Sequence, residues 1–105
     1  MNFKGLLPTL ILESLVAGPS HGYQIAQEIK VRSREVLDFK EGTLYPALHK
    51  LERDGHVESY ETIENGRMRR CYRITRTGRA MLAQDRAQWQ QLSRAVTHIL
   101  GEAKA

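Results

Sequence analysis

The feature that most constrains the fold is a two-residue turn signal between two runs of β-prone residues. Asn65-Gly66 separates segments of about 56–63 and 69–75, which carry β-branched and aromatic residues. Asn-Gly favours the tight turn whose twist matches that of two antiparallel strands. The sequence therefore predicts one β-hairpin, and a chain of 105 residues has room for a single domain around it.

Three helical patterns precede the hairpin. The first has an apolar face over about residues 7–16 and ends where Gly18-Pro19 stops it. The second begins after Ser20, a residue type that caps helices well, and loses its pattern near residue 32. The third is predicted over residues 43–54, with Pro46 in its first turn. A last helix, capped by Thr75 or Thr77, then runs towards residue 100.

This order of elements is that of a winged helix-turn-helix. In that fold the third helix enters the major groove of DNA and the hairpin, called the wing, lies along the DNA backbone. The third helix has the apolar back that this requires: Leu44, Ala47, Leu48 and Leu51. We expect a mostly α fold with a small β-hairpin, a DNA-binding domain over residues 1–77 and a C-terminal dimerisation helix over residues 78–105.

Positive charge is concentrated in one part of the chain. Sixteen Lys and Arg against twelve Asp and Glu give a formal charge of +4, too small by itself to indicate a polyanionic partner. The stretch from Arg67 to Arg79 holds no acidic residue and six arginines: Arg67, Arg69, Arg70, Arg73, Arg76 and Arg79. Although such a run is usually only a solvated face, we expect the wing, residues 63–70, to contact phosphates through its first three arginines. The other three are open between DNA contacts and ion pairs with neighbouring acids.

The outer face of the third helix supplies the other candidate DNA contacts. His49, Lys50 and Arg53 lie about one turn apart on one side, with base reading assigned first to His49 and Lys50. Lys40 and Thr43 are expected near the N-terminal end, where backbone N–H groups favour phosphate. The Tyr45 hydroxyl is either a phosphate contact or part of a ring packed at the domain edge.

The sequence also resembles a known family. The motifs are Ser20-His21-Gly22-Tyr23, Gly42-Thr43-Leu44-Tyr45-Pro46-Ala47-Leu48, Leu51-Glu52 with Gly55, and Gly66-Arg67-Met68-Arg69-Arg70-Cys71-Tyr72-Arg73-Ile74-Thr75 with Gly78. Their order and spacing are similar to the signature of the PadR family of bacterial transcriptional regulators over about residues 4–80. The resemblance implies a dimeric winged-helix repressor whose affinity for DNA falls when an effector binds. Tyr23 in the first motif joins the candidate DNA contacts.

The sequence departs from the family pattern at three points. Its single C-terminal helix resembles the short subgroup, so effector rules of the longer members do not transfer. Cys71 stands where the family often has an aromatic or basic residue, and Met68 stands where Pro is frequent. The geometry of the wing tip therefore does not follow from the resemblance.

The last helix carries a seam of apolar residues at alternating steps of three and four. The seam consists of Leu82, Trp89, Leu92, Val96 and Ile99, with Asp85 as a polar interruption. One small domain offers no second layer to cover such a helix, so we expect a second copy of the chain to cover it, aided by Leu7 and Leu10 of the first helix. A two-fold dimer predicts a pseudo-palindromic operator with half-sites about 34 Å apart. The alternative is that the helix folds back on its own domain.

Trp89 has two interpretations. A single Trp in a helix seam is more often a packing anchor than a platform for a ligand. The family resemblance implies the second role, because short members hold flat aromatic compounds between Trp residues paired across the dimer. A small aromatic effector would then contact Trp89, Leu92 and Asp85, whose charge either favours a cationic ligand or specifies helix register.

The sequence carries no signature of an enzyme, a metal site or a membrane span. Its four His lack metal-ligand spacing, and Cys71 is the only cysteine, which fits a reducing cytoplasm. No phosphate loop, metalloprotease motif or paired nucleophile and base is present. We expect a cytoplasmic, sequence-specific DNA-binding repressor that acts as a homodimer without a cofactor. The alternative is a winged-helix module that binds protein and has no operator.

Overall fold

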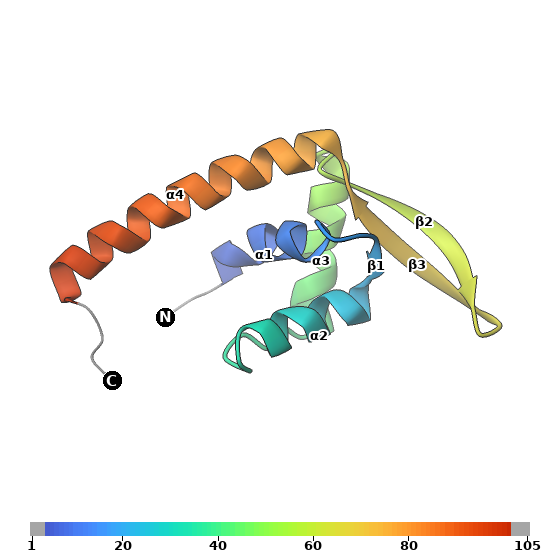
Figure 1. The fold of residues 1–105 in the computed structure, drawn as a ribbon. Helices are drawn as coiled ribbons and strands as arrows, with labels where there is room; N and C mark the ends of the chain where they lie inside the picture. Colours follow the sequence, from blue (N-terminus) through green and yellow to red (C-terminus); the bar gives the residue numbers. More distant parts are fainter. Residues whose placement is uncertain (1–3, 102–105) are drawn as a thin grey trace.

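The computed structural model describes residues 4–101, so the outermost ends of the two predicted domains, residues 1–3 and 102–105, lie outside the described residues. A mostly helical fold with one small sheet is confirmed (Figure 1). The elements in chain order are the short 3₁₀ helix η1 (Lys4–Leu6), α1 (Leu7–Ser14), β1 (Ser20–His21), α2 (Gly22–Arg32), α3 (Glu41–Arg53), β2 (Val57–Glu64), β3 (Arg67–Ile74) and α4 (Arg76–Leu100).

The core lies between α1, α2, α3 and the base of the sheet. Its fully buried side chains are Leu7, Ile11, Leu12, Leu15, Ile25, Leu44, Leu48, Val57 and Tyr72. The first helical pattern was predicted to extend to about residue 16, which is wrong at its C-terminal end. Helix α1 ends at Ser14, and Val16 is 37% exposed because the chain turns away.

Helix α3 confirms the predicted apolar back. Leu44, Leu48 and Leu51 are at most 5% exposed and face the core. The helix begins at Glu41, earlier than predicted, so Pro46 is the sixth helical residue rather than part of the first turn. Since proline has no N–H, the hydrogen bond that a residue at this position would donate to Gly42 is missing.

The hairpin has the predicted turn but belongs to a sheet of three strands. Asn65 and Gly66 have φ of 52° and 76°, as a tight turn with two left-handed residues requires. The strand order is β1-β3-β2, because Ser20 and His21 pair with Tyr72 and Cys71. Ser20 is therefore a strand residue and not the predicted N-cap. His21 caps α2 instead, since its Nδ1 accepts a hydrogen bond from the backbone N–H of Gln24 at 3.4 Å.

Helix α4 starts at the base of the hairpin and runs across α1 to the opposite end of the molecule (Figure 1). Of the two predicted N-cap candidates, Thr75 and Thr77, the N-cap is Thr75, which accepts a hydrogen bond from the backbone N–H of Gly78 at 3.0 Å. Gly78 is buried, and a Cβ atom there would overlap the carbonyl oxygen of His56. This close approach fixes where α4 leaves the sheet. None of the helices between residues 4 and 101 combines the length and apolar character that crossing a membrane needs.

Candidate nucleic-acid interface

The outer face of α3 presents a short row of polar side chains. His49, Lys50 and Arg53 are all exposed, on the side opposite the buried leucines. The Nζ atom of Lys50 lies 3.2 Å from Oδ2 of Asp54, so part of its charge is already offset. Among residues 4–101 no carboxylate lies within ion-pair distance of Arg53. Arg53 is therefore the least compensated cation of this helix.

The N-terminal end of α3 carries the other predicted contacts. Lys40 is the N-cap residue, and its 81% exposed side chain lies 3.0 Å from Oδ2 of Asp38. The hydrogen bond from Lys40 holds the pKa of the Asp38 carboxyl below its usual value. Thr43 is half-buried one turn further on. The positive charge of Lys40 and of the backbone N–H groups at this helix end is therefore offset by Asp38 and by Glu41 in the first turn of α3.

The two candidate tyrosines differ in their surroundings. Tyr23 on α2 is 63% exposed, with its ring 6.5 Å from that of His21. Tyr45 is half-buried, and its hydroxyl end occupies the space that a Cβ atom at Gly22 would need. The packed position of its ring supports the interpretation that Tyr45 closes the domain edge between α3 and α2.

The wing differs from the sequence prediction in its charge balance. The register of the hairpin sets Glu58 opposite Arg73, Glu61 opposite Arg70 and Glu64 opposite Arg67. Three ion pairs form across the strands: Arg73–Glu58 at 3.0 Å, Arg70–Glu61 at 3.3 Å and Arg69–Glu64 at 3.7 Å. The expectation of an unopposed run of arginines is therefore wrong. The acids of β2, which lie outside the window from Arg67 to Arg79, offset half of it.

The remaining three arginines of that run have no carboxylate within ion-pair distance among the described residues. They are Arg67, Arg76 and Arg79, and all three are exposed. Of the three arginines whose role was left open, only Arg73 makes an ion pair, and its guanidinium also lies 5.4 Å from the centre of the Tyr60 ring. The uncompensated positive charge of the hairpin therefore lies at its tip, on Arg67.

A chain of hydrogen bonds connects the wing to α3. Arg70 donates from Nη1 to the hydroxyl of Ser59 at 2.9 Å, and that hydroxyl donates to Oε2 of Glu52 on α3 at 2.5 Å. Neither Ser59 nor Glu52 was a predicted site residue. The signal was present in the sequence, because a two-residue turn at Asn65-Gly66 fixes which residues face one another across the hairpin.

Similarity to known proteins shows to which family a chain with this arrangement of helices and wing belongs. The model of the "Transcriptional regulator PadR-like family" matches residues 11–84. The chain belongs to the PadR family. Members of this family are transcriptional regulators and not enzymes, so this PadR-family chain is a regulator with a winged-helix DNA-binding fold.

Individual relatives agree with this assignment. The regulator is 42% identical over 86 residues to the transcriptional regulator Rv3488 of Mycobacterium tuberculosis, a match that covers 82% of this chain and 78% of that protein. It is similar to a transcriptional regulator of Clostridium thermocellum, with a TM-score of 0.83, 34% identity and coverage of 94% and 93% of the two chains. A PadR family regulator of Clostridium difficile R20291 gives a TM-score of 0.81 at 30% identity, with coverage of 92% and 100%.

The residues predicted for dimerisation fall into two groups in this PadR-family structure. Leu7 and Leu82 are 1% and 5% exposed and belong to the core of their own chain, so they leave almost no surface for a partner. Leu10 is half-buried. The rest of the seam is open: Trp89, Leu92, Val96 and Ile99 are 49%, 56%, 42% and 83% exposed.

The residues predicted to bind an aromatic effector line a hollow of about 490 Å³ between α1 and α4. Trp89, Leu92 and Asp85 come from α4, and Leu6, Thr9 and Leu10 lie across from them. Asp85 is half-buried and accepts a hydrogen bond from the Thr9 hydroxyl at 2.9 Å. Arg86 pairs with Glu13 of α1 at the same contact. The carboxylate of Asp85 thus holds α4 on α1, which its sequence position did not reveal.

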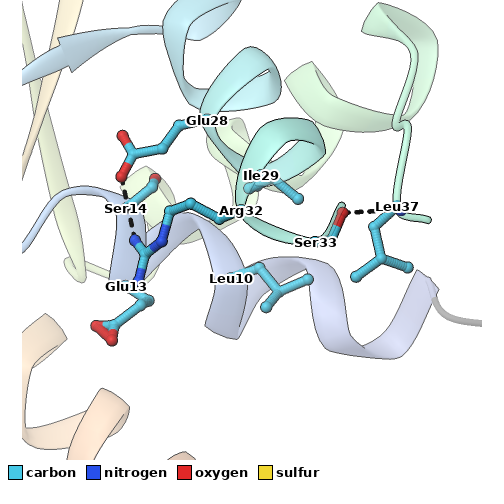
Figure 2. Close-up of a pocket in the computed structure, with 8 residues that line it drawn as sticks. All are labelled: Leu10, Glu13, Ser14, Glu28, Ile29, Arg32, Ser33 and Leu37. Carbon is cyan, nitrogen blue, oxygen red and sulfur yellow. Dashed lines mark hydrogen bonds and ion pairs between the residues drawn. The ribbon is translucent and has the colours of Figure 1, made fainter. Parts of the chain in front are cut away.

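A second hollow, of about 250 Å³, lies between α1 and α2 (Figure 2). Its apolar lining consists of Leu10, Ile29 and Leu37, and an exposed ion pair of Glu28 with Arg32 spans one side. Leu10, Glu13 and Leu37 line both hollows. The two hollows therefore adjoin along α1.

Proposed function

We propose that the protein is a sequence-specific repressor that binds a pseudo-palindromic operator as a homodimer and is released by a small aromatic effector. The observation that most supports DNA recognition is the difference between the two faces of α3. Its leucines are buried, whereas His49, Lys50 and Arg53 are exposed on the opposite side. A helix of this kind fits the major groove. The region 43–54 would read base edges, and the wing, residues 63–70, would follow the backbone.

Because two of the wing arginines are paired with acids, they contribute less to the electrostatic attraction between the wing and phosphate. Arg69 and Arg70 already hold carboxylates, whereas Arg67 meets none among the described residues. We therefore assign the strongest phosphate contacts of this interface to Arg53 and Arg67. Lys40 and Thr43 at the start of α3, with Tyr23 on α2, would add weaker contacts to phosphates.

Support for a homodimer comes from the exposed half of α4. Past Arg86, which pairs with Glu13 of α1, α4 continues beyond the domain body (Figure 1), and the seam from Trp89 to Ile99 is between 42% and 83% exposed. A second copy would bury Trp89, Leu92, Val96 and Ile99 against its own seam and against Leu10. Such a dimer would set two α3 helices at the spacing of successive major grooves.

Support for an effector site comes from the hollow between α1 and α4, beside that seam. It combines the ring of Trp89, aliphatic side chains of both helices and two carboxylates, Asp85 and Glu13, the second of which is paired with Arg86. A flat compound on Trp89 that prefers a different separation of the two α4 helices would lower the population of the DNA-binding dimer. The affinity for the operator would fall without any contact between the effector and DNA.

The decisive experiment is selection of duplexes from a random library by the wild-type protein, followed by fluorescence anisotropy at several salt concentrations. The regulator interpretation requires a selected, palindromic duplex that binds far more tightly than random DNA. Arg53→Gln and Arg67→Gln should each weaken binding and lower the salt slope by roughly one unit. Arg32→Gln, which removes an exposed cation from α2, is the matched control. Equal affinity for selected and random duplexes would leave the protein-binding module as the alternative.

The dimer and the effector are tested separately. Light scattering after gel filtration should give twice the chain mass, and Leu92→Asp should return the single-chain mass with the helical content retained. Trp89 fluorescence should change with one or more members of a panel of planar aromatic compounds. An unaltered signal across the panel would remove the effector from the proposal and leave DNA binding in place.

A further inference from the structure

We propose that the tip of the wing is an apolar wedge, formed by Ile63 and Met68, that enters the minor groove of DNA. This inference rests on the proposed DNA-binding function and names the groove and the kind of contact that the wing makes. Ile63 and Met68 are directly opposite each other in the hairpin register, one residue pair below the pair that closes the turn. They are 69% and 65% exposed, so the two large apolar side chains form a small exposed apolar pair.

Ile63 and Met68 continue one face of the hairpin, and the part of that face nearer the domain body is buried. Because successive residues of a strand alternate between faces, Ile63 shares its face with Glu61, Ser59 and the buried Val57, and Met68 shares that face with Arg70 and the buried Tyr72. This is the face that hydrogen-bonds to α3 through Ser59 and Glu52. The apolar pair therefore lies on the same side of the hairpin as the recognition helix.

The hairpin carries this pair well beyond the body of the domain. Met68 lies six residue steps from Ile74 at the base of the hairpin, which corresponds to about 20 Å of strand. The minor groove next to an occupied major groove is about half a helical turn away, roughly 17 Å. The hairpin projects from the domain body (Figure 1), its strands are long enough to span this separation, and Ile63 and Met68 near its tip are exposed.

The charged residues around Ile63 and Met68 favour DNA as the binding partner of the wing tip. Arg67 is the next residue to Met68, and no carboxylate among the described residues lies within ion-pair distance of it. Arg69 pairs with Glu64, the acid that faces Arg67 in the hairpin register, and no other acid of the described residues lies in the last two residue pairs of the hairpin. The Asn65 amide at the turn can donate to the acceptors on the groove floor. Ile and Met flanked by Arg and Asn are the residue types that proteins insert between base steps in the minor groove.

The test compares the double variant Ile63→Ser/Met68→Ser with the wild type on the selected duplex. Burial of two apolar side chains releases no counterions, so the affinity should fall about tenfold while the salt slope stays unchanged. Arg67→Gln should lower the slope instead. Val36→Ser, at a 71% exposed apolar residue after α2, is the matched control and should leave the affinity unchanged. All of these positions are exposed, so folding is preserved, and thermal melts verify this.

A second arm identifies the groove. Replacing guanine by inosine at the base pairs beneath the wing removes only the amino group that projects into the minor groove. The wild type should bind the inosine duplex more tightly than the guanine duplex, and the double variant should bind both equally.

Three results would overturn the proposal. They are an unchanged affinity of the double variant, a fall in affinity that comes with a lower salt slope, and an inosine preference that the double variant retains. An unchanged affinity together with an altered molecular mass in light scattering would assign the tip to contacts between copies of the chain. In each of these cases the wild type still prefers its selected duplex. If no duplex can be selected at all, the proposed function itself has failed, and the two failures are distinguishable.

Discussion

Arg70 and Glu61 face each other across the hairpin, with Nη2 of Arg70 3.3 Å from Oε1 of Glu61, while the same guanidinium hydrogen-bonds to Ser59. One side chain thus serves both the charge balance of the wing and its attachment to α3. The pair is about half exposed on each side, so it contributes little to the stability of the fold.

Glu61→Gln should strengthen DNA binding, because it removes a negative charge that would repel phosphate and leaves Arg70 uncompensated. We expect a gain of about two- to fivefold in affinity near 0.1 M salt, with a smaller gain at higher salt. Fluorescence anisotropy across a salt series measures it. Glu28→Gln, which disrupts the exposed Glu28–Arg32 pair on α2, should have a smaller effect. An equal effect of the two variants would mean that only net charge matters.

Gly78→Ala should destabilise the protein strongly. A Cβ atom there meets the backbone carbonyl of His56, which cannot move without displacing the start of α4 from the hairpin. We expect a loss of about 2–4 kcal/mol in the free energy of unfolding, measured by urea denaturation. Gly42→Ala, in the first turn of α3 with nothing within 4 Å, should be neutral or should gain up to about 1 kcal/mol. Similar losses at both positions would contradict the close approach.

Thr9 and Asp85 should behave as a coupled pair. The hydroxyl of Thr9 donates to the carboxylate of Asp85 at 2.9 Å and joins α1 to α4. A double-mutant cycle with Thr9→Val and Asp85→Ala should give a coupling free energy of about 1 kcal/mol in unfolding experiments. If the two losses simply add, the hydrogen bond contributes nothing, and α4 is held by apolar packing and the Glu13–Arg86 pair.

The Cys71 thiol should give the protein a dependence of stability on alkaline pH. Burial raises the pKa of Cys71, and the Glu64 carboxylate raises it further while Arg69 opposes the shift. The unfolded chain therefore releases its thiol proton at lower pH than the folded protein. The corresponding stability is complete below about pH 8.5 and is lost as the pH rises further.

Urea denaturation between pH 7.5 and 9.5 measures this loss, and Cys71→Ala should flatten the profile in that range. Burial also raises the pKa of Tyr72, but a phenol titrates at higher pH and is common to both proteins. A thiol reagent should react slowly with the native protein at pH 8 and rapidly in urea. Identical pH profiles of the two proteins would show that Cys71 remains protonated in both states.

The parts of the fold that depend on local sequence were predictable. Leu44, Leu48 and Leu51 repeat at helical spacing, Thr75 caps α4, and Asn65-Gly66 specifies its own turn geometry. The strand at Ser20 and His21 was not, because it exists only through pairing with Tyr72 and Cys71, about fifty residues away. A strand of two residues is too short to show the alternation of apolar and polar residues that indicates a strand.

The candidate site was predictable in its residues but not in its charges. The exposed row on α3 follows from the helical repeat, whereas the charge balance of the wing depends on the acids of the facing strand, which lie outside the arginine-rich stretch from Arg67 to Arg79. Cross-strand neighbours such as Glu61 and Arg70 are nine residues apart and become adjacent only when the hairpin closes. The buried positions of Leu7 and Leu82 depend likewise on how α1 and α4 cross, which an apolar seam alone does not specify.

Strand β2 lies at the edge of the sheet, and there its carboxylates have a second effect, on contacts between copies of the chain. The strand order β1-β3-β2 leaves the backbone of β2 without a partner on its outer side, and eight residues of unpaired strand invite pairing with another chain. Glu58, Glu61 and Glu64 are spaced along that edge. If two copies met there, strand against strand, like charges would come together. The acids that reduce the electrostatic attraction between the wing and DNA would thus keep neighbouring copies from pairing into an extended sheet at high concentration.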